Sequence, residues 1–265
     1  LPAVLTLAAA ATVSGPGAVA LVARAAGVRR SVAHAFELAA VLDSAFGALA
    51  FAFALALYHP HGPFTGLAVG WLAWVAVAGA ASGGVGMLFL WLARLRPNPN
   101  ELGFDLLGVM LVGAGVGYAA GLSPFVVCAL ATALIVHRSP HKRRVRALLE
   151  AWEHPIYAVC LIVAGALLVL PTVWLAPAAL LLGLVRVAAR WAPGRFALPP
   201  HLGLGTIAQG GIAVALGLSF HLTYGGVDPR AGAISTTVLL GVALAQAAAG
   251  PLMALALRPA RREVT

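Results

Sequence analysis

Long apolar stretches, separated by short loops that carry arginine, follow one another along the whole of this chain. A helix needs about 20 apolar residues to cross the hydrocarbon core of a bilayer. Nine stretches approach or exceed that length, near positions 1–23, 31–58, 64–93, 102–120, 122–137, 155–170, 172–189, 202–222 and 231–257. The sequence therefore predicts an all-α integral membrane protein, with nine spans in a single domain over residues 1–265.

The composition excludes a water-soluble globule. Hydrophobic residues make up 62% of the chain and charged residues only 9%, whereas about a quarter of a soluble domain is charged. A transmembrane β-barrel would alternate apolar and polar residues over about ten positions, and these stretches do not alternate. Because lipid cannot pair exposed backbone groups, we expect the spans to be helical.

The basic residues predict the orientation of the chain. With nine spans, sixteen of the seventeen Lys and Arg residues fall on one side, and only Arg230 falls on the other. The positive-inside rule makes the basic side cytoplasmic, so the C-terminus is expected there. The net charge of +9 is then explained by topology and by contacts with anionic lipid, and we expect no nucleic-acid partner. The polar stretch from Arg138 to Glu153 is predicted to be a connector.

One carboxylate is placed at mid-membrane depth. Asp43 lies near the centre of the second predicted span, where an ionisable group is costly and therefore a functional candidate. The alternative is a structural carboxylate paired with an arginine or a hydroxyl group. Arg186, deep in the seventh span, is a candidate counter-charge, whereas Arg190 is expected to extend to the interface. Glu37 is predicted to line an entrance from the cytoplasm, with simple solvation as the alternative.

Two spans contain signals for an interrupted helix. In "TVSGPGAV", Gly15, Pro16 and Gly17 stand among apolar residues, and in "GLGTIAQGGIA" four glycines surround Thr206 and Gln209. Proline removes a backbone donor, and glycine lowers the cost of unwinding. A pair of interrupted spans in corresponding halves indicates a transporter binding site. Close helix packing is the alternative explanation for the glycines.

Motifs for other chemistry are not found in the sequence. It contains no P-loop, no G-x-S-x-G elbow and no histidine or cysteine spacing typical of a metal site. We therefore expect no metal and no cofactor, and a membrane enzyme is the class that the sequence supports least.

The segments, taken in order, resemble the monovalent cation/proton antiporters, also called sodium/hydrogen exchangers. "AAAATVSGPGAVALVARAAGV" resembles the unwound fourth helix of that family. "AAVLDSAFGALAF" resembles the next helix, which usually carries an Asp-Asp or Asn-Asp pair followed by a glycine. "GLGTIAQGGIAVALGLSF" is similar to the second crossing helix, and the resemblance continues over nearly the whole chain.

This resemblance implies a helical bundle with inverted repeats and two broken crossing helices. It implies a homodimer, and further family helices that would precede Leu1. The abundance of Ala, Leu, Val and Gly favours a bacterial source, so the expected location is a bacterial inner membrane. The implied function is secondary active exchange of Na⁺ or K⁺ for H⁺ by alternating access. Asp43 would be the titrating carboxylate. The polar neighbours and the counter-charge would be Ser44, Thr12, Ser14, Gln209 and Arg186.

The acidic pair of the family is incomplete in this chain. Aligned on Gly47, Asp43 takes the first position of the pair and Ser44 takes the second, which usually holds the ion-carrying aspartate. A shift of one residue gives Asp43 that role but displaces Gly47. The second hypothesis is therefore a degenerate, non-transporting homologue that acts as a membrane scaffold or sensor subunit.

Overall fold

The computed structural model describes residues 2–25, 27–28, 30–58, 71–95, 101–168, 173–196 and 200–262. Every regular element in these ranges is an α-helix. The helices are α1 Pro2–Thr12, α2 Pro16–Ala25, α3 Arg30–Leu57, α4 Trp71–Leu95, α5 Leu102–Ala119, α6 Pro124–Arg138, α7 Lys142–Ala166, α8 Leu175–Phe196, α9 Pro200–Gly205, α10 Gly211–Tyr224 and α11 Ala231–Arg262.

The lengths of these helices suit a bilayer. Within the described ranges, seven segments are long and apolar enough to cross a membrane when α1 and α2 are counted together, and the apolar helices α6 and α10 are shorter. Each of the nine predicted stretches thus contains an apolar helix, although positions 1, 64–70 and 169–172 lie outside the described residues. By length and composition, the chain is a multi-pass α-helical membrane protein.

The prediction of a connector between Arg138 and Glu153 is wrong, because α7 already begins at Lys142. The first half of this helix is amphipathic. Val145 is fully buried, and Leu148 and Trp152 pack against the same hydrophobic core. Apolar residues at positions three, four and seven apart line one face of a helix, and this spacing is easily overlooked among so many arginines.

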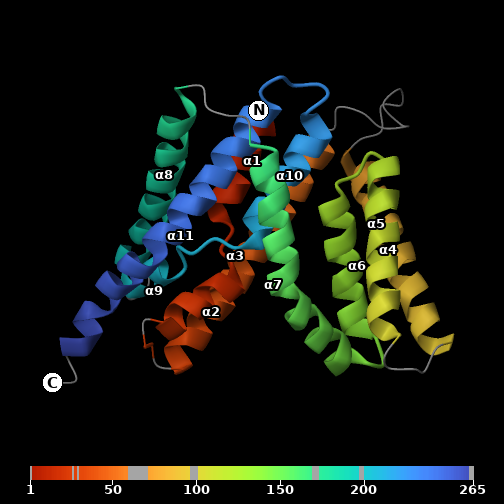
Figure 1. Ribbon diagram of the computed structural model, residues 1–265, viewed down its shortest axis with the longest axis horizontal. Coiled ribbons are helices and arrows are strands. Elements are labelled where there is room, and N and C mark those ends of the chain that lie inside the picture. The colour runs from red at the N-terminus through yellow and green to blue at the C-terminus, as the bar shows by residue number, and fades with distance from the viewer. Residues whose placement is uncertain are drawn as a thin grey trace. The chain divides into compact units, whose positions relative to one another are not determined.

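The chain forms two compact units, Leu1–Phe51 with Cys160–Thr265, and Ala52–Val159. In the second unit, α4, α5 and α6 pack against one another in every pairing (Figure 1). Their core includes Phe89, Leu106 and Ile135, which are fully buried. The single transporter-like domain expected over residues 1–265 stays a prediction.

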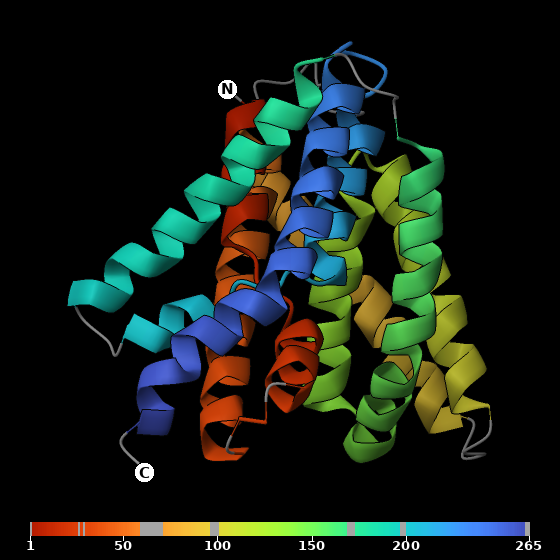
Figure 2. The ribbon, with the colours of Figure 1, turned by 60° about the vertical axis from the view of Figure 1, so that its left-hand side comes forward.

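In the first unit, the long helix α11 packs against α8, α9 and α10, and also contacts α1 and α2 (Figure 2, blue). A small core of Val19, Phe36 and Met253 joins α2, α3 and α11. This unit contains both segments that were predicted to be interrupted.

Both predicted interruptions are present. Residues 13–15 separate α1 from α2, and residues 206–210 separate α9 from α10. The two interruptions lie against each other, since the Gly15 N–H donates to the Ala208 carbonyl at 3.0 Å. The inverted repeats and the crossing of the two helices stay predictions.

Glycine is required where the two interruptions meet. A Cβ added at Gly15 would lie 2.4 Å from Cα of Gly210, and one added at Gly210 would lie 2.8 Å from Cα of Gly15. Neither backbone leaves room for a side chain on the other.

We predict that Gly15→Ala lowers the stability of the protein by about 1–3 kcal/mol, because the added methyl group forces the two backbones apart. Thermal melting of the detergent-solubilised protein, followed by size-exclusion chromatography, measures this effect. Gly250→Ala on α11 is the matched control, since nothing lies within 4 Å of the added Cβ there. Equal melting temperatures for the two variants would contradict the close approach.

Candidate functional site

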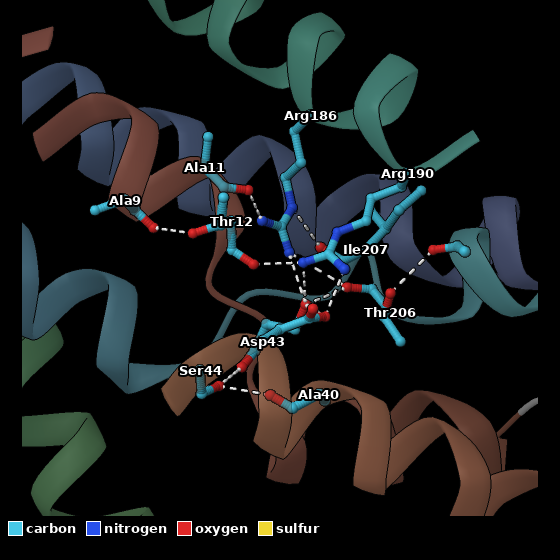
Figure 3. A network of polar contacts seen from close by, with 12 residues as sticks. Ala9, Ala11, Thr12, Ala40, Asp43, Ser44, Arg186, Arg190, Thr206 and Ile207 are labelled. Atoms are coloured by element: carbon cyan, nitrogen blue, oxygen red, sulfur yellow. Dashed lines mark hydrogen bonds and ion pairs between the residues drawn. The ribbon is translucent and has the colours of Figure 1, made fainter. Parts of the chain in front are cut away.

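Two arginines on one face of α8, one turn apart, extend toward the paired interruptions (Figure 3). Arg186 is the more deeply placed, with 2% of its surface exposed. Its guanidinium donates to the carbonyl of Ala11, to the Ile207 carbonyl at 3.0 Å, and to the Thr206 carbonyl and Ser14 Oγ at 3.3 Å each. Arg186 therefore joins both interruptions to α8.

Arg190 is the partner of Asp43. Its Nη1 lies 2.5 Å from Asp43 Oδ2, and the two side chains are 16% and 28% exposed. Its Nη2 donates to the Thr12 carbonyl and, at 3.0 Å, to Ser14 Oγ. The Arg190 guanidinium is thus bonded to a carboxylate, a carbonyl and a hydroxyl oxygen.

This geometry corrects one prediction and refines another. Arg190 does not extend to the interface, because its guanidinium is drawn inward by Asp43 and by the end of α1. The ion pair of Asp43 is made by Arg190 and not by Arg186. The spacing of four residues puts both arginines on the same face of the helix, but the sequence does not give the direction in which that face points.

The C-terminal end of α1 explains why the arginines turn inward. The last four carbonyls of a helix have no donors within the helix, and here each of the four accepts a hydrogen bond from a side chain. The donor and acceptor pairs are Thr12 Oγ1 to Ala9 at 2.8 Å, Gln209 Nε2 to Ala10 at 2.8 Å, Arg186 to Ala11 and Arg190 to Thr12. Side chains from α8 and from the second interruption thereby complete the end of α1.

The two serines add hydroxyl groups to the network. Ser14 Oγ lies 2.8 Å from the Thr206 carbonyl and 3.2 Å from Asp43 Oδ2. A hydroxyl carries one hydrogen, so Ser14 donates to only one of these two oxygens at a time. Ser44 Oγ lies within reach of the Ser14 carbonyl and 2.7 Å from the Ala40 carbonyl.

The structure brings together most of the residues that the sequence indicated. They are Asp43, Ser44, Thr12, Ser14, Gln209 and Arg186, and each makes a contact at or beside the interruptions. Gln246 was not predicted, although it is the only amide side chain in the last predicted span. Its Nε2 donates to the Gln209 carbonyl.

Glu37 takes no part in this network within the described part of the chain. It lines a hollow of about 840 Å³ between α2 and α3, together with Arg24, Arg30, Ser31 and His34. Its Oε2 lies 3.7 Å from His34 Nδ1. The role of Glu37 at an entrance stays a prediction.

Charges of both signs meet at this site. The two guanidinium groups face one carboxylate and the C-terminal end of α1, which carries a partial negative charge. In a poorly screened interior such interactions are strong, so removal of Asp43 would leave two guanidinium groups without the carboxylate. The site is stable as a set and not as separate pairs.

No protein-family model matches this chain, and no curated protein matches it. The function is therefore inferred from the geometry and chemistry of the site.

We predict that Arg186→Met destabilises the protein by about 3–5 kcal/mol, because carbonyls at both interruptions lose their donors and Asp43 loses a nearby positive charge. Arg186→Lys recovers only part of the loss, since an ammonium group lacks the planar fork of donors. Thermal melting in detergent measures both variants against Arg24→Met, which removes an exposed arginine of α2. If Arg186→Met melts like Arg24→Met, the network does not hold the interruptions together.

Proposed function

We propose that this protein is a secondary active transporter that exchanges Na⁺ or K⁺ for H⁺ by alternating access, with Asp43 as the carrying carboxylate. The observation that supports this most directly is the set of oxygens bonded to Arg190: Asp43 Oδ2, the Thr12 carbonyl and Ser14 Oγ. Hard metal cations take such oxygen ligands. The position that the Arg190 guanidinium occupies is thus chemically suited to a metal cation.

Competition for one carboxylate would couple the two fluxes. In the described arrangement Asp43 is neutralised by Arg190. A bound cation or a bound proton would neutralise the carboxylate instead, and either would release the guanidinium. An unpaired charge is costly in a poorly solvated site. Asp43 would therefore exchange one positive partner for another, and its carboxylate would seldom be unpaired.

The two arginines are suited to different parts of this cycle. Arg186 makes four hydrogen bonds and is 2% exposed, so it holds the interruptions in place. Arg190 is less enclosed, with 16% of its side chain exposed. Arg190 would therefore be the group that leaves Asp43, while Arg186 would keep the surrounding carbonyls paired.

Ser44 is the observation that favours the second candidate function, a degenerate homologue acting as a scaffold or sensor subunit. Ser44 brings no charge, and its hydroxyl is directed to the Ser14 and Ala40 carbonyls. Asp43 is then the one acidic side chain of the network. In this alternative, its pair with Arg190 is permanent and stabilises the fold without binding an ion.

The remaining features of the proposal follow the charge pattern and the family resemblance. The membrane would be a bacterial inner membrane, with the basic loops and the C-terminus on the cytoplasmic side. The transporter would act as a homodimer.

We predict that pulses of Na⁺ or K⁺ drive proton movement in proteoliposomes that contain the wild-type protein, and that Asp43→Asn abolishes it. The amide keeps the shape of the side chain but cannot exchange a proton for a cation. A pH-sensitive dye reports the flux. Glu153→Gln, which neutralises an exposed carboxylate of α7, is the control and should keep full flux.

The same assay separates the two candidate functions. If well-folded wild-type protein moves no protons with Na⁺, K⁺ or Li⁺ at acidic, neutral or alkaline pH, the exchanger proposal is wrong and the scaffold hypothesis gains support. Flux that persists in Asp43→Asn would instead remove Asp43 from its carrying role.

We predict that Arg190→Gln lowers the cation concentration that gives half-maximal flux by about tenfold. The cation then no longer has to displace a positive charge, and about 1.4 kcal/mol of competition corresponds to that factor. Glutamine keeps a donor for the Thr12 carbonyl, so loss of folding is a smaller concern than with an apolar residue. An unchanged or raised half-saturation concentration would contradict competition between Arg190 and the cation.

A further inference from the structure

A dense group of positive charges lies at the junction of α6 and α7. Five Lys and Arg residues fall between positions 138 and 146, and His137 and His141 accompany them. From Leu106 to Leu149 the sequence contains no acidic residue. The positive charge here is therefore local and uncompensated along the chain.

The junction has a defined shape. Ser139 is buried, its N–H donates to the Ile135 carbonyl at 2.8 Å, and its Oγ accepts from the His141 N–H at 3.1 Å. The residues from Arg138 to Arg144 line a hollow of about 680 Å³. Backbone and capping bonds thus shape the loop around an open depression.

The basic side chains at this hollow are available for a ligand. Those of Arg138, Lys142, Arg143, Arg144 and Arg146 are exposed. In the part of the chain that the structure describes, none of them makes an ion pair or a side-chain hydrogen bond. Water and salt screen the repulsion among these five like charges, and an anion bound among them reduces it further.

The first half of α7 fixes these charges at the end of the membrane spans. Val145 and Trp152 face the core of the second unit, so the arginines lie on the exposed face. Leu130 on α6, and Ile156 and Val159 farther along α7, are exposed apolar side chains. Each of the two helices that meet at the junction therefore also carries exposed apolar side chains that acyl chains can contact.

We propose that the α6–α7 junction is a binding site for the headgroup of an anionic glycerophospholipid. Clusters of four to eight Lys and Arg residues next to a membrane span attract anionic lipids, each charge contributing to the affinity. The lipid phosphate lies among the basic side chains that line the hollow, and the acyl chains lie along the exposed apolar residues of α6 and α7. A lipid contacts both the basic side chains and the apolar side chains, whereas a free phosphate ion would contact only the basic ones.

The test uses the full chain in detergent with added phosphatidylglycerol or phosphatidylcholine. We expect phosphatidylglycerol to raise the melting temperature by several degrees more than phosphatidylcholine does. The variant Lys142→Gln/Arg143→Gln/Arg144→Gln should lose that difference. The control Arg24→Gln/Arg30→Gln/Arg94→Gln removes the same number of exposed charges elsewhere and should keep it.

One further variant and one further measurement complete the test. The charge-conserving variant Arg143→Lys/Arg144→Lys should keep the effect, which separates loss of charge from loss of folding. The amount of phosphatidylglycerol that copurifies with each variant, measured by mass spectrometry, should follow the same order. The proposal is overturned if wild type does not distinguish the two lipids, if the control variant loses as much as the junction variant, or if inorganic phosphate alone reproduces the whole shift.

Discussion

Carbonyl groups that an interrupted helix leaves without donors are the constraint on which the first unit depends. An unpaired backbone group away from water costs several kcal/mol. Two interruptions side by side increase the number of such groups. Side chains remove it here: two arginines of α8 and two glutamines supply the missing donors. The interruptions, the glycine contact between them and the position of α8 are consequently one structural arrangement.

The same arrangement determines what the site can do. Because the donors are guanidinium groups, positive charge is introduced together with the hydrogen bonds, and a carboxylate nearby becomes favourable. Asp43 meets that requirement and remains partly exposed. The exchanger and the scaffold hypotheses differ in a single physical respect, which is whether Arg190 can leave this carboxylate for a competing cation or proton.

Local features of the sequence were sufficient for much of the fold. Apolar length is a property of each segment, so the spans were predicted. Proline with glycine indicated the first interruption, and glycines indicated the second. Asp43 was recognised because an ionisable residue at membrane depth is unusual wherever the helix faces. Gln209 and Ser14 were noted because they lie in the two interrupted segments. The inward turn of Arg190 could not be predicted in this way, since it depends on the rotation of α8 relative to α1. The start of α7 was missed for another reason, because its apolar residues, three and four positions apart, stand among arginines. Gln246 was missed because nothing in the sequence shows that its amide lies next to the Gln209 carbonyl.

The hydrogen bond from Arg186 to Ala11 also has a consequence for the order of events during synthesis. Its two residues are separated by 175 positions, so a ribosome adding 5–20 residues per second makes the acceptor roughly 10–35 s before the donor. During that interval the end of α1 has neither arginine available. The nascent first segment must then stay in contact with water or with the insertion machinery, or adopt another conformation, until α8 arrives. The interruption between α1 and α2 is thus completed late, as a product of assembly.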